Sequence, residues 1–362
     1  MINILFIVSH LQPQGPNKQL LSLCRNLNKE NFNLVIVTTS QNIFKNSLHK
    51  EYYKFKIQIY DLKLSKVQSI IRGTKEIQNI INLNKIDIIF SYGFRSDFIS
   101  SKLKSVIKVS SVRNTLLLNW KITWGPFLGS IFGKINLYYI KKFDYVIACS
   151  SSVSNHLYNL NLQNITIRNS IDALRLQKKF NKCDFKNKDK PKSLLTISSK
   201  LKGKNIEFLL KSFTNKELSN YKLYVAGYVE PNTIKEFNCY SNIKFLGHIH
   251  NLYDYINTVD FFISASLHEG MPNAVLESLA IGTPVILSDI NSHKEIFNQQ
   301  EYKIGSIFKN NSYASLKNSI DEVFKLKYKY LSLNCKNAVL ENFSIDKMTN
   351  EYENFFSSIV NP

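Results

Sequence analysis

The sequence lacks the marks of several protein classes. Its five cysteines form no Cys-x-x-Cys pair and have no His partner at metal-ligand spacing, which argues against a disulfide framework and a zinc site and predicts a reducing compartment. No run of about 18 apolar residues occurs. The first residues, MINILFIVSH, have neither a basic n-region nor a cleavage site and are typical of a buried strand. We therefore expect a cytoplasmic protein.

Acidic residues are scarce. The chain has 27 Asp and Glu against 47 Lys and Arg, a formal net charge of +20. This excess predicts attraction to an anionic partner, whether nucleic acid, a membrane surface or a phosphorylated substrate. A biased composition rich in Lys, Asn and Ile is the alternative explanation, and charge alone does not choose among these.

Short hydrophobic runs, each about as long as a β-strand, are abundant. With 362 residues, 44% of them hydrophobic, the chain can form two buried cores. In the first half, strands are expected at 2–8, 33–39, 86–92, 106–112 and 145–150, and a further strand with a turn at 165–172. A helical stretch with a Gly-Pro start follows the first strand. Strands alternating with helices predict βα units and a parallel sheet.

The same alternation restarts after a polar, Lys-rich stretch. Further strands are expected at 193–199, 222–227, 242–247, 260–266 and 283–289. We therefore predict an α/β protein with two Rossmann-like domains, 1–174 and 193–344, joined by a linker at 175–192. A C-terminal helix within 345–362 could pack back on the first domain. Parallel sheets bind ligands outside the carboxyl ends of their strands, so a cleft between the domains is the expected site.

The stretch HEGMPNAVLESLAIGTPVILSD, residues 268–289, has two carboxylates around a turn before an apolar helix. Pro272 suits the first helical turn, and the amides there are suited to bind phosphate or sugar hydroxyls. Glu277 lies one to two turns into the helix, and Gly282 is suited to end it. Glu269 and Glu277 are thus placed to hold two hydroxyl-bearing groups. The alternative is that both are ordinary surface acids.

This stretch resembles the E-x7-E signature of glycosyltransferase family 4, the retaining GT-B enzymes that use nucleotide sugars. NSID (169–172), LYVAG (223–227) and FLGHIHNLYDYINTVDFFISAS (245–266) are similar to other family segments. The resemblance covers nearly the whole chain and implies the GT-B fold, a nucleotide-sugar substrate and no cofactor. The absence of an Asp-x-Asp motif agrees with a metal-independent mechanism.

The resemblance also implies roles for individual residues. Glu269 would contact the donor sugar near its reacting carbon, and Glu277 would bind the ribose hydroxyls. The turn would hold the sugar and diphosphate through amides around Gly270, Met271, Pro272 and Asn273.

In SSKLKGKNIEFLL, Lys200 and Lys204 match the cations that neutralise the leaving diphosphate, and Ser199 stands where the family has Arg. The alternative is that these lysines only solvate a loop.

In the first half, Gly15 occupies the place of the family's first-loop glycines, although the motif here is Gly-Pro. Arg113 stands where family members commonly have a His facing the donor sugar. A guanidinium stays protonated and cannot act as a base, but it can orient a sugar or phosphate. A strand-end surface charge is the alternative.

Residues 114–143 interleave aromatic side chains with four lysines and contain no acid. This pattern suits an anionic membrane surface, and hence a peripheral protein at the inner face of the cytoplasmic membrane with a lipid-linked acceptor. A core helix with a basic exposed face is the alternative. No motif supports nucleic-acid binding.

The sequence thus predicts a retaining hexosyl- or N-acetylhexosaminyltransferase that acts on a glycan or lipid-linked saccharide in bacterial surface-polysaccharide assembly. Two alternatives stay open: a nucleotide-sugar epimerase or hydrolase of the same fold, and a non-catalytic subunit that binds nucleotide sugars or glycans.

Overall fold

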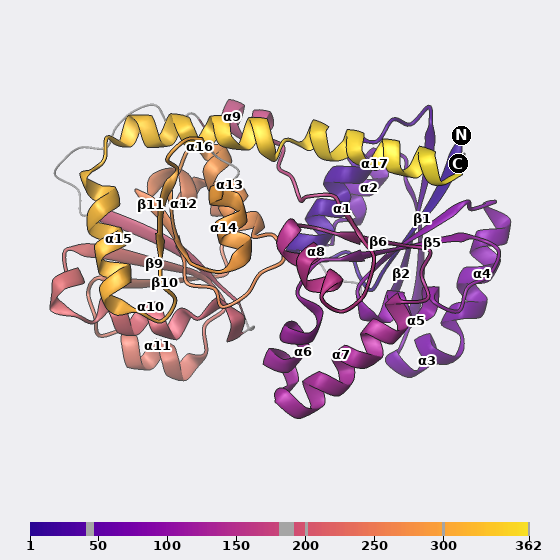
Figure 1. Ribbon diagram of the computed structural model, residues 1–362, viewed down its shortest axis with the longest axis horizontal. Coiled ribbons are helices and arrows are strands. Elements are labelled where there is room, and N and C mark those ends of the chain that lie inside the picture. Colours follow the sequence, from indigo (N-terminus) through magenta and orange to yellow (C-terminus); the bar gives the residue numbers. More distant parts are fainter. Residues whose placement is uncertain (41–46, 181–191, 200–201, 299–300, 361–362) are drawn as a thin grey trace. The chain divides into compact units, whose positions relative to one another are not determined.

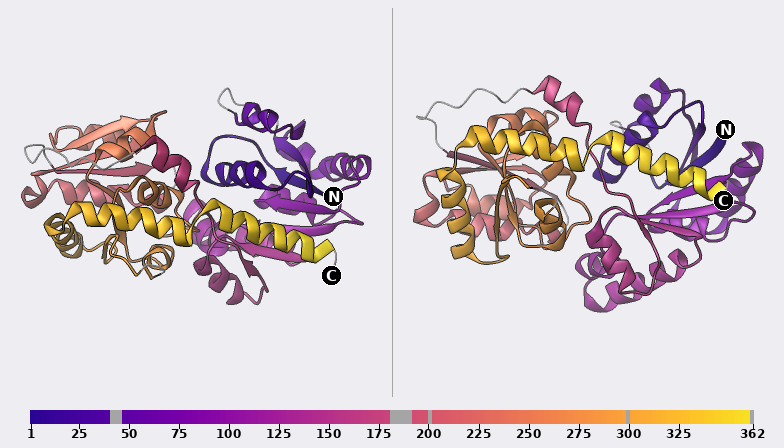
Figure 2. Two further views of the ribbon diagram at one scale, coloured as in Figure 1. Left: turned by 90° about the horizontal axis from the view of Figure 1, so that it is seen from above. Right: turned by 45° about the horizontal axis from the view of Figure 1, so that its top comes forward.

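The structure is a computed structural model that describes residues 1–40, 47–180, 192–199, 202–298 and 301–360. The chain divides into two compact units (Figure 1). The first unit contains Met1–Ser170 and Ile345–Pro362, and the second contains Ile171–Ser344. Each unit is a parallel sheet with helices on both faces (Figures 1 and 2), so the predicted α/β fold class is confirmed.

The sheet of the first unit has seven strands in the order β3-β2-β1-β4-β5-β6-β7. Its strands pair in parallel throughout. Their bounds are β1 Ile2–Val8, β2 Phe32–Ser40, β3 Gln58–Leu64, β4 Ile88–Tyr92, β5 Ile107–Val112, β6 Tyr145–Ala148 and β7 Ile165–Thr166.

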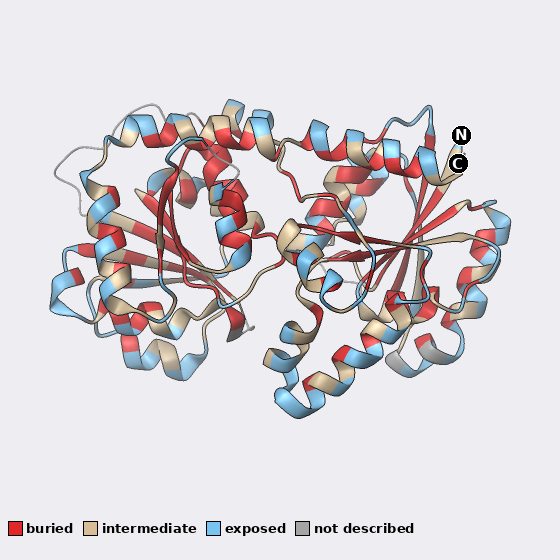
Figure 3. Ribbon diagram, viewed as in Figure 1, coloured by how far each residue is buried: buried red, intermediate tan, exposed pale blue. Residues whose placement is uncertain are grey.

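Alternate residues of β1 enter opposite cores of the first unit, as the two-residue period of a strand requires. Ile4 and Phe6 pack with α1 (Gly15–Asn26), α2 (His49–Lys54) and α17 (Ile345–Val360). Leu5 and Ile7 pack with α4 (Gly73–Leu83) and α5 (Phe94–Ser100) on the other face. The strands are accordingly buried, and the outer helix faces are exposed (Figure 3). Two further helices of this unit are α3 Lys66–Ile71 and α8 Ser151–Tyr158.

A two-helix hairpin lies between β5 and β6. Its helices, α6 (Leu116–Trp124) and α7 (Pro126–Ile140), pack tightly against each other. A Cβ added at Gly129 would come within 2.4 Å of the Trp120 carbonyl oxygen and of the Lys121 Cα. A glycine at this position therefore sets how closely the two backbones can approach.

The sheet of the second unit has six strands in the order β10-β9-β8-β11-β12-β13, again all parallel. They are β8 Lys192–Ser198, β9 Tyr221–Gly227, β10 Ile243–Gly247, β11 Phe261–Ser264, β12 Val285–Ser288 and β13 Gly305–Phe308.

The helices of the second unit also cover both faces of its sheet. One core joins the sheet to α10 (Ile206–Phe213) and α15 (Tyr313–Lys325). Elsewhere in the unit, α13 (Asn273–Ile281) packs with α9 (Ala173–Lys179) and α16 (Tyr328–Asn342). The other elements are η1 Lys202–Lys204, η2 Lys216–Leu218, α11 Pro231–Phe237, α12 Leu252–Thr258 and α14 Asn291–Asn298.

The structure corrects several sequence predictions. The expected linker at 175–192 is wrong at both ends, because 175–179 belong to α9 and Lys192 begins β8; residues 181–191 lie outside the described ranges. Strands β3 and β13 were not predicted. No residue of β3 is fully buried, so its apolar signal is weak, whereas β13 is too short to stand out. The strand and turn expected within 165–172 are present, with the strand at Ile165–Thr166.

Candidate functional site

The first candidate cluster lies at the carboxyl ends of β8 and β11 in the second unit. Lys204, the last residue of η1, donates to Glu269 Oε1 at 2.5 Å. Ser266 Oγ donates to the same carboxylate oxygen at 2.8 Å. Two residues predicted to act on the donor are therefore joined directly, because β8 and β11 are neighbours in the sheet.

Charge and burial act against each other at Glu269. Burial favours the neutral acid, but Lys204, assisted by His293 and Ser266, outweighs it, and the pKa of Glu269 falls below its ordinary value. The carboxylate is therefore ionised at neutral pH. An ionised carboxylate at a strand end can accept hydrogen bonds from sugar hydroxyls.

His293, near the start of α14, borders this cluster. Its Nδ1 lies 2.9 Å from the Ser288 carbonyl oxygen, so Nδ1 carries the proton and donates. Burial lowers the pKa of His293 to about 4, although Glu269 opposes that shift. Nε2 of the neutral ring is buried and has no hydrogen-bond partner within the described residues.

The predicted turn connects β11 to α13. Gly270, Met271 and Pro272 are buried, and Asn273 is the first residue of the helix. Gly282 ends α13 in the left-handed conformation, with φ of 90°, as predicted.

Glu277, in the second turn of α13, is 6% exposed, and its Oε1 accepts a hydrogen bond from the Tyr253 hydroxyl at 3.1 Å. Burial raises the pKa of Tyr253 well above its usual range, and the charge of nearby Glu277 raises it further. The hydroxyl therefore keeps its proton and remains a donor. Glu277 is thus a buried, hydrogen-bonded carboxylate and not a surface acid. Its partner lies on α12, whereas Glu269 is held by η1 and the β11 end.

Two further predicted residues lie directly beside or at the start of regular elements. Ser199 directly follows β8, and Gly15 is the first residue of α1. Lys200 lies outside the described residues.

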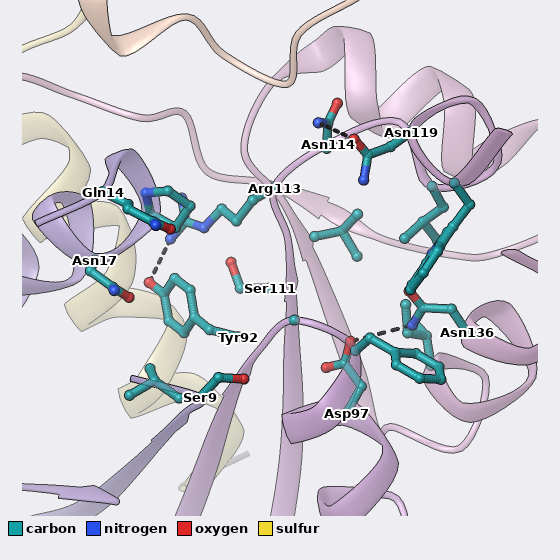
Figure 4. Close-up of a pocket in the computed structure, with 18 of the residues that line it drawn as sticks. Ser9, Gln14, Asn17, Tyr92, Asp97, Ser111, Arg113, Asn114, Asn119 and Asn136 are labelled. Carbon is teal, nitrogen blue, oxygen red and sulfur yellow. Dashed lines mark hydrogen bonds between the residues drawn. The ribbon is translucent and has the colours of Figure 1, made fainter. Parts of the chain in front are cut away.

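The second candidate site is a cavity of about 280 Å³ within the first unit (Figure 4). It opens at the carboxyl ends of β1, β4 and β5, where β1 lies between β2 and β4 and the chain order of the strands reverses. Ligands of parallel sheets bind at such points. The α6–α7 hairpin supplies one wall through Asn119, Trp120 and Asn136.

Arg113 follows β5 and lines this cavity. Its Nη1 donates to Asn169 Oδ1 and its Nη2 to the Tyr92 hydroxyl, both at 2.5 Å. The guanidinium also lies over the Tyr92 ring, 4.7 Å from its centroid. Burial opposes the positive charge and the hydrogen bond to Tyr92 favours it, and the guanidinium stays protonated at neutral pH. Arg113 is therefore a partly buried strand-end cation and not a surface charge.

Asp97 lines the cavity away from Arg113 (Figure 4). Its Oδ1 accepts from Ser91 Oγ at 2.7 Å and from Ser110 Oγ at 3.1 Å, and Asn136 Nδ2 lies 3.5 Å from Oδ2. Burial raises the pKa of Asp97 to about 6 although these three donors oppose the shift.

The sequence analysis missed Asp97, Asn119, Asn136, Ser266 and His293. Asp97 follows the strand predicted at 86–92 and Ser266 ends the strand predicted at 260–266, so their position was a usable signal. Nothing local marks Asn119 and Asn136, because only the packing of the α6–α7 hairpin brings them to the cavity.

The described residues contain no group of three or more His, Cys, Asp or Glu side chains placed to hold a metal ion. Across the same residues, no helix has both the length and the apolar character that crossing a bilayer would require.

Residues 177–338 match the family model described as glycosyl transferases group 1. This match lies within the second unit and includes Glu269, Lys204 and Glu277.

Full-length comparisons agree with this match. The chain is 24% identical to the O-antigen biosynthesis glycosyltransferase WclY of Escherichia coli, with 99% of each chain covered. It is 23% identical to the capsular polysaccharide biosynthesis glycosyltransferase CapH of Staphylococcus aureus, again over 99% of each chain.

The fold is similar to the crystal structure of Anabaena Alr3699/HepE in complex with UDP-glucose, with a TM-score of 0.77, 12% identity, and 99% and 100% of the two chains covered. Together these similarities support a glycosyltransferase with the GT-B fold, similar to enzymes of bacterial surface-polysaccharide synthesis.

Proposed function

We propose that this protein is a metal-independent, retaining glycosyltransferase that moves a hexose or N-acetylhexosamine from a nucleotide sugar to a glycan or lipid-linked saccharide of a bacterial surface polysaccharide. The observation that carries the proposal is the Lys204–Glu269 pair, at 2.5 Å, on neighbouring strand ends within the segment that matches the family model. The second unit holds the donor in this proposal, and the first unit holds the acceptor.

Each part of the donor has a chemically suited group in the second unit. Glu269 is ionised and can accept from hydroxyls of the transferred sugar. The Lys204 ammonium and the backbone amides that begin α13 can stabilise the diphosphate as it leaves and gains charge. Buried Glu277 can accept from the ribose hydroxyls. Lys200 and Ser199 stay predicted diphosphate contacts, and Gly15 stays a predicted contact in the first unit.

Ligand-induced thermal stabilisation tests the donor site. The intact protein is heated with UDP-, GDP-, dTDP- and CMP-sugars, and the shift in melting temperature is compared with that of Glu277→Ala and of Glu236→Ala, an exposed acid on α11. One class of nucleotide sugar should stabilise the intact protein and Glu236→Ala, but not Glu277→Ala. If no nucleotide sugar stabilises the protein, or if Glu277→Ala responds fully, the proposed donor site is wrong.

Product analysis separates this function from its rivals. An epimerase or hydrolase consumes the stabilising donor without an acceptor, whereas a binding subunit stabilises but never turns it over. A transferase releases the nucleotide diphosphate and forms a new glycoside only when an acceptor is present. Retention of the anomeric configuration in that glycoside, read by NMR, tests the stereochemical part of the proposal.

The α6–α7 hairpin supports the membrane part of the proposal. Phe127, Ile131, Ile135 and Tyr138 recur at helical spacing on α7 and are exposed, as is Trp124 at the end of α6. Lys121, Lys134, Lys141 and Lys142 are exposed on or beside the same helices, where no acid occurs between 114 and 143. An apolar stripe with uniformly positive surroundings fits an anionic lipid surface.

Aromatic residues of the hairpin divide into two groups. Trp120 belongs to the internal group, because its Nε1 donates to Asn136 Oδ1 at 3.3 Å and its ring meets Phe94 edge to face at 5.3 Å. Trp124 and Phe127 are 55% and 76% exposed. Only the exposed group is available to lipid.

Vesicle co-sedimentation tests this surface. Trp124→Ser, Phe127→Ser and Ile131→Ser, combined in one protein, should reduce binding to phosphatidylglycerol-containing vesicles by about tenfold or more, since each buried apolar side chain contributes about 1.5–3 kcal/mol. The matched control replaces Tyr330 and Leu333, 63% and 55% exposed in the second unit, and should bind like the unmodified protein. Equal binding by both variants would contradict the membrane surface.

A further inference from the structure

Among the described residues, the guanidinium of Arg113 has neutral hydrogen-bond partners only. They are the Asn169 amide oxygen and the Tyr92 hydroxyl, and the Tyr352 hydroxyl is a further neutral neighbour. Nε is buried and has no hydrogen-bond partner within the described part of the chain. A charge that is removed from water without a counter-ion is costly, and an added anion would offset that cost.

The charges around this end of the cavity add to the imbalance. Arg95 follows β4 and lies close enough to lower the pKa of His10, a shift caused mainly by burial of the ring and then by the Arg95 charge. His10 lines the cavity, and its lowered pKa keeps the ring neutral at neutral pH, so it adds no positive charge and leaves Arg113 without a counter-ion. The acid among the lining residues is Asp97, which lies across the cavity from Arg113 (Figure 4).

The opposite side of the cavity is suited to a sugar ring. Trp120 contributes an aromatic surface of the kind that packs on sugar rings, whereas Asn119, Asn136 and Asp97 supply amide and carboxylate groups for hydroxyls. The volume of about 280 Å³ is just below the usual range for small-molecule pockets, which starts near ~300 Å³. One saccharide ring with one substituent fits that volume better than an oligosaccharide does.

We propose that this cavity recognises an acidic saccharide, with the carboxylate or phosphate of the ligand bound by Arg113 and its ring beside Trp120. The inference rests on the proposed transferase function and specifies its acceptor as a sugar that carries an anionic group near the hydroxyl to be glycosylated. Arg113 is then a specificity-determining residue of the first unit. Its planar fork suits a carboxylate or phosphate, and Tyr92 and Asn169 hold the fork in position.

Calorimetric titration of the whole protein, without donor, tests the inference. The probes are D-glucuronate, which carries a carboxylate, glucose 6-phosphate, which carries a phosphate, and D-glucose, the neutral control. At least one acid should bind ten times or more tightly than glucose, and the preferred one identifies the anion. The titration extends to about 10 mM ligand, which detects a millimolar Kd.

Substitutions assign that preference to Arg113. Arg113→Gln should reduce the affinity for the preferred acid 10- to 100-fold, to the level of glucose, and Arg113→Lys should retain part of it. Arg25→Gln, which removes an exposed guanidinium on α1 of the same unit, should bind like the unmodified protein. The inference is wrong if neither acid binds, if glucose binds equally well, or if Arg113→Gln binds the acids unchanged.

The nucleotide-sugar response of the second unit serves as the internal check. If Arg113→Gln keeps its stabilisation by the donor, the loss of acid binding is local and not a folding failure. If a nucleotide sugar stabilises the unmodified protein but the acidic sugars bind no better than glucose, only this inference is overturned. Loss of donor stabilisation in the unmodified protein would overturn the proposed function instead.

Discussion

The central strands of the two sheets have the same order, but different side chains follow their carboxyl ends in the two units. The strands β1, β4 and β5 of the first unit occupy the sheet positions that β8, β11 and β12 occupy in the second. After β11 comes Glu269, ion-paired with Lys204, whereas β4 ends at Tyr92, bonded to Arg113. The cation of the second unit thus has an anionic partner, and the cation of the first unit has neutral ones.

The strand order sets where the polar groups gather in each unit, whereas the side chains set whether their charges are balanced. In both units the polar groups gather where the strand order reverses, because the crossover helices leave that edge open. The charges of Lys204 and Glu269 in the second unit balance each other within the protein. The unbalanced guanidinium in the first unit favours an anion directly.

A second difference between the units is the connection that follows β5 in the first and the equivalent strand β12 in the second. The first unit has the α6–α7 hairpin between β5 and β6, whereas the second has α14 between β12 and β13. The hairpin contributes Trp120, Asn119 and Asn136 to the cavity and carries the exposed apolar stripe. One insertion therefore adds both a cavity wall and a surface suited to lipid.

The largest expected effect comes from removing the Lys204 ammonium, which is paired with Glu269 in the second unit. Lys204→Met should lower kcat with the preferred donor by about 10²–10³-fold, because a positioned group that stabilises the leaving diphosphate typically contributes that much. Steady-state kinetics measures it. Lys211→Met, which breaks only the exposed pair with Glu207 on α10, is the control. Similar rates for both variants would leave Lys204 as a structural partner of Glu269.

The next effect concerns the buried acid of the first unit. A carboxyl whose pKa is 3.8 in the unfolded chain and about 6 in the fold binds its proton more tightly when folded. The stability that it contributes is therefore complete below about pH 3.8 and is lost as the pH rises through 6, by about 3 kcal/mol in total.

Asp97→Asn should remove this pH dependence. Urea unfolding at pH 4 and pH 7 should show the unmodified protein losing about 2–3 kcal/mol relative to the variant across that interval. Asp346→Asn, an exposed acid in the first turn of α17, should follow the unmodified protein. A constant difference between Asp97→Asn and the unmodified protein at both pH values would contradict the raised pKa.

The smallest expected effect concerns the hairpin that distinguishes the first unit. Gly129→Ala should destabilise the protein by about 1–3 kcal/mol, because the new Cβ overlaps the α6 backbone and forces the helices apart. Urea unfolding measures the loss, and Ser130→Ala on the same turn of α7 is the control. A stabilised Gly129→Ala protein would mean that helix propensity outweighs the overlap.

The sequence predicted the parts of the fold that have strong local signals. Apolar runs located β1, β2 and β8 to within a residue, because parallel strands buried on both faces are almost continuously hydrophobic. The 268–289 stretch predicted α13 and its Gly282 terminus from turn residues and helical spacing. The division of 114–143 into two helices was missed, although Gly125-Pro126 stands at the break.

What the sequence determined by itself is therefore the α/β architecture, which follows from the alternation of strands and helices, and the candidate residues Glu269, Glu277, Lys204 and Arg113, whose roles the family resemblance implies. Tertiary structure alone decided their partners. It joined Lys204 to Glu269 across 65 positions, buried Glu277 against Tyr253 and left Arg113 among neutral groups. The physical reason is that hydrogen bonding and desolvation depend on distances in space, which parallel strand order and helix packing set and which no local pattern encodes.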